Sequence, residues 1–145
     1  MGAWYWIGVS AGLGTAVGVL VAAVVSSGRA AMIAGGVAAV LVAAGLGFGI
    51  HEWQPGGWAD VAVAAVASLL GLFGAAQIVK GALRRGGTRG GTGTLMTGAA
   101  LVLAGLAWIP VVGYLEAIVV PIFAARSRRA QPERYAGLRT LARDE

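Results

Sequence analysis

Three long stretches without a charged side chain constrain this chain more than any other feature. They run from about Trp4 to Val25, from about Ala30 to Ile50 and from about Val61 to Val79. A helix rises about 1.5 Å per residue, so each stretch reaches roughly 30 Å, the thickness of a bilayer's hydrocarbon core. Hydrocarbon cannot satisfy backbone N–H and C=O groups, which a helix pairs internally. The pattern therefore predicts transmembrane helices.

The overall composition agrees with a membrane protein. Of the 145 residues, 58% are hydrophobic and only 12% are charged, whereas a soluble domain carries roughly 25% charged residues. We therefore predict an all-α integral membrane protein, with a transmembrane helical domain over residues 1–125 and a basic cytoplasmic tail over 126–145. The net charge of +5 comes from cations that flank apolar segments, so anionic lipid headgroups are the expected partners rather than nucleic acid.

The region 95–125 is long for one span and short for two. Pro110 and Gly113 lie near its middle and Pro121 lies further on; proline and glycine both favour a kink or a reversal. Pro110 and Gly113 are thus the expected hinge or re-entrant turn, with segments 95–109 and 114–125 on either side. The arms reach only about 22 and 18 Å, so a spanning hairpin, a re-entrant hairpin and one long kinked helix all stay open. The bundle has four transmembrane segments, or five if this region turns back.

The distribution of lysine and arginine favours the reversal. With the N-terminus outside, a chain that turns back places all eleven Lys and Arg residues on the cytoplasmic side, whereas a single crossing puts the six tail arginines outside. The positive-inside rule prefers the first arrangement. It also places all five tryptophans at the opposite face, and it suits a prokaryotic inner membrane. The connection 80–94, rich in glycine and arginine, is expected to be flexible.

Small residues recur at helical spacing in the apolar segments. Such strips let two helix backbones approach closely in lipid. Packing inside the bundle is favoured over a dimer face, although a homo-oligomer or a larger membrane complex remains an alternative. The candidate packing residues are Gly8, Gly12, Gly14, Gly18, Gly35, Gly47 and Gly71.

Glu116 is the only ionisable residue inside an apolar segment. A charge near the bilayer centre costs about 3 kcal/mol or more, so such residues are often functional. Glu116 is the candidate ion or proton site. The alternative is that Glu116 lies just past an interfacial turn and faces water.

Other polar groups carry weaker signals. His51, Glu52 and Asp60 are expected in an interfacial loop, because the chain has a single histidine and a zinc motif of the H-E-x-x-H kind needs two. Nothing resembles a catalytic arrangement, so we expect no enzyme, no metal site and no cofactor. The candidate lipid-headgroup contacts are Arg84, Arg85, Arg89, Arg126, Arg128 and Arg129.

Three functional hypotheses follow from these observations. The first is a structural or partner-binding membrane subunit that packs through its small-residue faces. The second is a small oligomeric channel or transporter with Glu116 at the pathway. The third is a membrane protein that binds anionic lipid.

Overall fold

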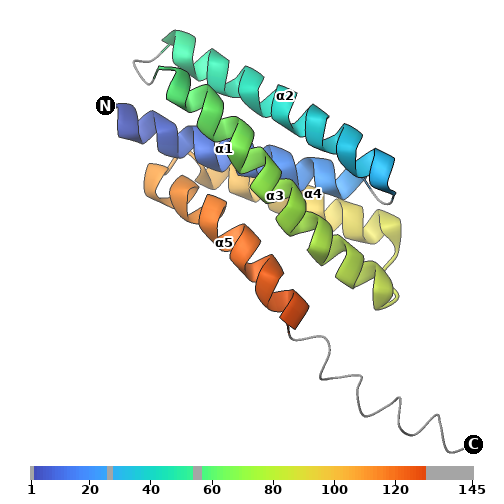
Figure 1. Cartoon of the computed structure of the whole chain (residues 1–145). Coiled ribbons are helices and arrows are strands. Elements are labelled where there is room, and N and C mark those ends of the chain that lie inside the picture. The colour runs from blue at the N-terminus through green and yellow to red at the C-terminus, as the bar shows by residue number, and fades with distance from the viewer. Residues whose placement is uncertain (1, 26–27, 54–56, 130–145) are drawn as a thin grey trace, which may run out of the picture.

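A computed structural model describes residues 2–25, 28–53 and 57–129, which form five helices joined by short connections (Figure 1). Most of the predicted tail, residues 130–145, lies outside the described residues. Three of the helices are long and apolar enough to cross a membrane: α1, α2 and α3. The helix bounds are α1 Ala3–Val24, α2 Arg29–Trp53, α3 Trp58–Arg84, α4 Arg89–Leu106 and α5 Pro110–Arg129.

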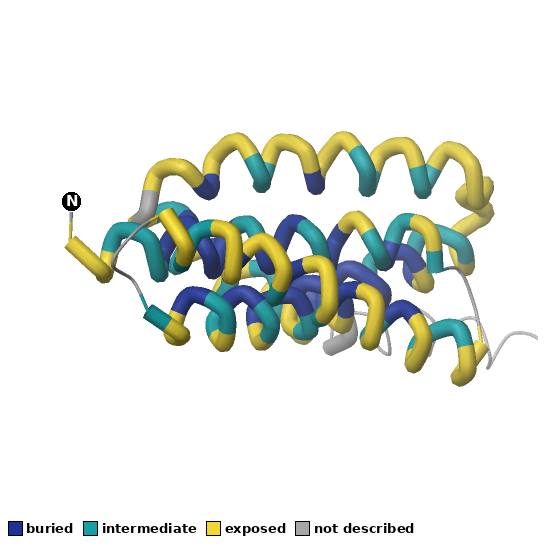
Figure 2. Tube along the Cα trace, turned by 90° about the horizontal axis from the view of Figure 1, so that it is seen from above, coloured by how far each residue is buried: buried dark blue, intermediate teal, exposed yellow. Residues whose placement is uncertain are grey.

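The five helices run alternately up and down, so α1, α3 and α5 are parallel to one another and α2 and α4 run the opposite way. Helix α1 is central, because it contacts all four other helices. Residues buried in the bundle face inward and the outer helix faces are exposed (Figure 2). Helix α4 is the least enclosed, with Ala100 as its one buried residue. Large apolar side chains on these outer faces are what a lipid environment accommodates.

The closest packing joins α1 to α3. Gly14 and Gly18 of α1 face the backbone carbonyls of Ala64 and Ser68, and Gly71 of α3 faces the carbonyl of Thr15. No Cβ atom would fit at any of these glycines without moving the backbone opposite. All seven glycines named as packing candidates are buried against neighbouring helices of the same chain.

The chain reverses between α4 and α5, at residues 107–109. Two tyrosines tie this reversal to the start of α1: Tyr5 donates a hydrogen bond to the carbonyl of Trp108 (3.1 Å), and Tyr114 donates one to the carbonyl of Trp4 (2.7 Å). The α4–α5 turn therefore lies at the same end of the bundle as the N-terminus. We name this the aromatic end, because Trp4, Tyr5, Trp53, Trp58 and Trp108 all lie at helix termini there.

The prediction that Gly113 forms part of the turn is wrong. Helix α5 begins at Pro110, a position where proline is favoured because the first helical N–H needs no partner. Gly113 is one turn inside α5 and packs against the carbonyl of Gly8. Its role is close helix contact rather than backbone reversal.

The helices also extend further than the sequence analysis predicts. Most of the expected flexible connection 80–94 is helical, since α3 continues to Arg84 and α4 starts at Arg89. The amide of Gly87 bonds the carbonyl of Ala82 and Gly86 has a φ of 88°, which is a Schellman termination of α3. Thr88 then caps α4 by accepting a bond from the amide of Gly91 at 3.1 Å.

With these extensions α4 and α5 are longer than the predicted arms. Helix α4 has 18 residues and α5 has 20, or about 27 and 30 Å. The opposite end of the bundle, where α3 ends and α4 starts, carries only basic side chains among the described charged residues. We name it the basic end, with Arg29, Lys80, Arg84, Arg85, Arg89 and Arg126.

Replacing Gly71 by alanine should destabilise the fold, because the added methyl group would overlap the carbonyl of Thr15. Overpacking of this kind costs about 1–3 kcal/mol. The control is Gly45→Ala on α2, where nothing lies within 4 Å of the added Cβ. Thermal unfolding in mild detergent should show a lower midpoint for Gly71→Ala alone. Equal midpoints for the two variants would show that α1 and α3 are less closely packed than described.

Candidate functional site

Glu116 lies on the inner face of α5, between the two points where α5 touches α1 and α3. Gly113, one turn earlier, packs against Gly8, and Val120, one turn later, packs against Gly74 of α3. Residues three, four and seven positions apart share one helix face, so Glu116 points into the same interface. Its side chain is only 6% exposed.

Neither carboxylate oxygen of Glu116 has a hydrogen-bond partner among the described residues. A carboxyl group that is removed from water and left unpaired is costly, and more so when it is ionised. The water-facing alternative for Glu116 is therefore wrong in this structure. Glu116 is seven residues beyond Ile109, or about 10 Å deeper than the turn, and protein encloses it.

Asp60 is a second buried carboxyl group, which the sequence analysis placed in an interfacial loop. It lies in the first turn of α3 and is 0% exposed. Ser10 of α1 donates a long hydrogen bond of 3.5 Å to Oδ1, while Oδ2 has no partner among the described residues. The loop assignment fails because α2 continues through His51 and Glu52 to Trp53, and α3 already starts at Trp58.

His51 and Tyr114 complete the surroundings of Asp60. Both are near enough to interact electrostatically with its carboxylate, and the His51 ring lies 5.3 Å from that of Trp58 between centroids. The Nδ1 atom of His51 is buried without a partner in the described part of the chain. Ser10, His51 and Asp60 thus form a polar cluster at the aromatic end, contributed by α1, α2 and α3.

The two carboxyl groups differ in what stabilises them. Asp60 sits at a helix N-terminus, where the helix dipole favours a negative charge, and it has the Ser10 hydroxyl. Glu116 is in the second turn of α5, with none of the described residues bonded to it. Asp60 therefore has a structural explanation, whereas packing and helix geometry do not explain Glu116.

The arginines predicted as lipid-headgroup contacts lie away from Glu116. Arg84, Arg85, Arg89 and Arg126 are exposed at the basic end. Arg128 and Arg129 belong to the last turn of α5, and their side chains lie outside the described part of the structure. Even Arg126 is ten residues past Glu116, or about 15 Å along the helix.

Comparison with known proteins assigns no function to this chain. No protein-family model matches the chain, and neither a curated protein nor a solved structure is significantly similar to it. Within the described residues, no three His, Asp or Glu side chains gather closely enough to hold a metal ion. The buried carboxyl group of Glu116, with both oxygens unpaired among the described residues, is therefore the group that still needs a functional explanation.

Replacing Ser10 by alanine should reveal how far Asp60 depends on its hydroxyl donor. The change removes the one hydrogen bond described for the Asp60 carboxyl group, and an unsatisfied buried acceptor costs about 1–3 kcal/mol. Ser68→Ala is the matched control, because Ser68 is equally buried but bonds a carbonyl of its own helix, that of Ala65. Unfolding in detergent should show a larger loss for Ser10→Ala. A loss no greater than that of Ser68→Ala would contradict the described contact.

Proposed function

We propose that this chain is a polytopic membrane protein that binds a proton or a monovalent cation at Glu116 and passes it across the membrane. The observation that carries the proposal is the Glu116 carboxyl group, which is enclosed by α1, α3 and α5 with both oxygens unpaired in the described structure. Ionisable residues inside a membrane are costly, and they mark ion and proton pathways more often than structural positions.

The alternative of a structural subunit that binds partners through small-residue faces has less support. The glycines that would form those faces are already in contact with other helices of the same chain, as Gly14, Gly18 and Gly71 illustrate. A partner helix would have to displace these contacts. The exposed apolar faces that remain are what lipid itself would cover.

In the proposed arrangement all five helices cross the bilayer. The lengths of α4 and α5, 18 and 20 residues, correspond to about 27 and 30 Å and match a hydrocarbon core of about 30 Å. The basic end faces the cytoplasm of a prokaryotic cell, as the positive-inside rule favours. The aromatic end lies at the outer interface, where tryptophan and tyrosine are enriched.

Asp60 and Glu116 then mark two depths along one path. Asp60 lies within one turn of the aromatic end of α3, and Glu116 lies about 10 Å beyond the α4–α5 turn. A cation that enters from the outer face would meet the polar cluster first and Glu116 second. Because α1, α3 and α5 of one chain enclose Glu116, the binding site itself does not require an oligomer.

A hydrophobic carbodiimide tests the binding site without knowledge of the transported ion. Such reagents modify carboxyl groups in apolar surroundings, and a bound cation protects them. Purified protein in detergent or liposomes should be modified at Glu116, as read by peptide mass spectrometry, and Glu116→Gln should lose this adduct. The matched control is Glu52→Gln, which removes an exposed carboxyl group at the aromatic end and should leave the adduct at Glu116 unchanged.

The transport part of the proposal needs a flux measurement. In proteoliposomes with an imposed potassium gradient, a pH-sensitive dye and sodium or potassium electrodes should report flux for the wild type and for Glu52→Gln. Glu116→Gln should reduce that flux at least tenfold, which corresponds to ~1.4 kcal/mol. Equal flux through Glu116→Gln and the wild type would refute the proposal. A Glu116 that the carbodiimide does not modify, whether cations are present or absent, would also refute it.

The proposed topology has its own test, because the chain contains no cysteine. Single cysteines at Ala59 and Ile109 report on the aromatic end and one at Gly90 on the basic end; all three positions are exposed. An impermeant maleimide should label Ala59→Cys and Ile109→Cys in intact cells, and Gly90→Cys only after permeabilisation. If Ile109→Cys behaves like Gly90→Cys, the α4–α5 hairpin does not reach the outer face.

A further inference from the structure

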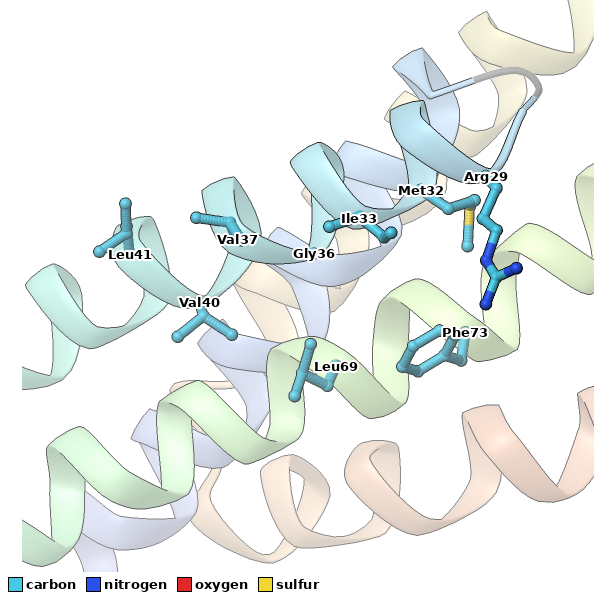
Figure 3. Close-up of a pocket in the computed structure, with 9 residues that line it drawn as sticks. All are labelled: Arg29, Met32, Ile33, Gly36, Val37, Val40, Leu41, Leu69 and Phe73. Atoms are coloured by element: carbon cyan, nitrogen blue, oxygen red, sulfur yellow. The ribbon is translucent and has the colours of Figure 1, made fainter.

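An open groove runs between α2 and α3 in the half of the bundle nearest the basic end (Figure 3). Its volume is about 450 Å³ and its walls are apolar except at one end. Gly36 forms part of its floor: a Cβ atom added there would have Leu72 as its nearest neighbour, at 3.8 Å. The missing side chain at Gly36, between larger residues such as Met32 and Val40, leaves the space open.

Arg29, the first residue of α2, closes the groove at the basic end. Figure 3 shows its side chain extending from α2 toward α3, on the side where Phe73 lies. The acidic residues among those described are all distant or enclosed: Glu52 lies 23 residues along α2, or about 35 Å away, and Asp60 and Glu116 are buried. Arg29 thus presents a cation at the end of an apolar groove, without an anionic partner from the described chain.

The dimensions of the groove match one leaflet of a bilayer. Its lining on α2 runs from Arg29 to Leu41, twelve residue steps or about 18 Å. Half of a hydrocarbon core of about 30 Å is about 15 Å. An arginine at the end of such a groove lies at the depth of the phosphate groups, where guanidinium and phosphate form strong charge-assisted hydrogen bonds.

We propose that this groove binds one anionic phospholipid of the leaflet at the basic end. One acyl chain lies over Gly36 between α2 and α3, against Leu69 and Phe73, and the phosphate group contacts Arg29. The net negative charge of the lipid complements the positive charge of the basic end. This inference goes beyond the proposed function and does not depend on Glu116.

A transmembrane helix of a partner fits the groove less well. A helix with its side chains is about 10 Å across and runs through the whole bilayer, whereas the groove ends near Leu41, about halfway along α2. A partner helix would also have to carry an acidic side chain at the depth of Arg29. A lipid supplies both the half-length and the anion.

Native mass spectrometry of delipidated protein, titrated with phosphatidylglycerol or phosphatidylcholine of the same chain length, tests the proposal. The wild type should retain phosphatidylglycerol preferentially, and Arg29→Gln should weaken its binding about tenfold, or ~1.4 kcal/mol. Lys80→Gln is the matched control, because Lys80 is exposed at the same end but does not line the groove. It should bind phosphatidylglycerol like the wild type.

A second pair of variants tests the groove itself. Gly36→Leu should fill the groove and reduce retention of both lipids, whereas Gly45→Leu, at an open position of the same helix outside the groove, should not. Equal losses of phosphatidylglycerol binding for Arg29→Gln and Lys80→Gln would show that general surface charge, not the groove, retains the lipid, and would overturn the proposal. A change of oligomeric state in Gly36→Leu with unchanged lipid retention would assign the groove to a second copy of the chain instead.

Discussion

The close approach of α1 to α3 and α5 is the contact on which the rest of the structure depends. In hydrocarbon, burying apolar side chains gains little, so helices associate through dispersion at short range and through polar contacts. Glycine permits such short distances between helix backbones: Gly18 faces the carbonyl of Ser68, and Gly113 faces that of Gly8. With α1 in contact with every other helix, these backbone contacts make one central helix the scaffold for four.

The same contacts create the chemistry of the interior. Where Gly113 brings α5 onto α1 and Gly74 receives Val120, little room remains for water, and Glu116 lies between the two contacts. A carboxyl group in such surroundings needs a proton or a cation to offset its charge. The packing that stabilises the bundle therefore also creates the enclosed carboxyl group on which the proposed ion binding depends.

Sequence reasoning predicts the helical membrane class and the small-residue packing positions, but it misses the ends of the helices. Apolar runs mark where a helix must be, whereas polar helix ends are encoded by capping. Gly86 and Thr88 act together as the stop of one helix and the start of the next, although the same letters resemble a flexible loop. The start of α3 is missed as well, and that error matters for the site. The helix begins at Trp58 rather than near Val61, so Asp60 lies in its first turn and is buried beside Ser10. The burial of Asp60 and the lack of a hydrogen-bond partner for Glu116 depend on which helices pack together. The spacing of apolar residues along the sequence does not specify these helix pairs.

Two neighbouring glycines of α2 show how one residue type serves opposite purposes in a membrane bundle. Gly35 faces α1, and a Cβ atom there would lie 2.7 Å from Val25, so its small size closes a contact. Gly36 is turned by 100° around the same helix toward α3, where its small size leaves a groove that Arg29 caps. Because the four-residue strip of Gly35, Ala39, Ala43 and Gly47 holds α2 on the bundle, the position beside it is free to bind something else. Helix contact and the proposed lipid contact thereby use neighbouring positions on a single turn of helix.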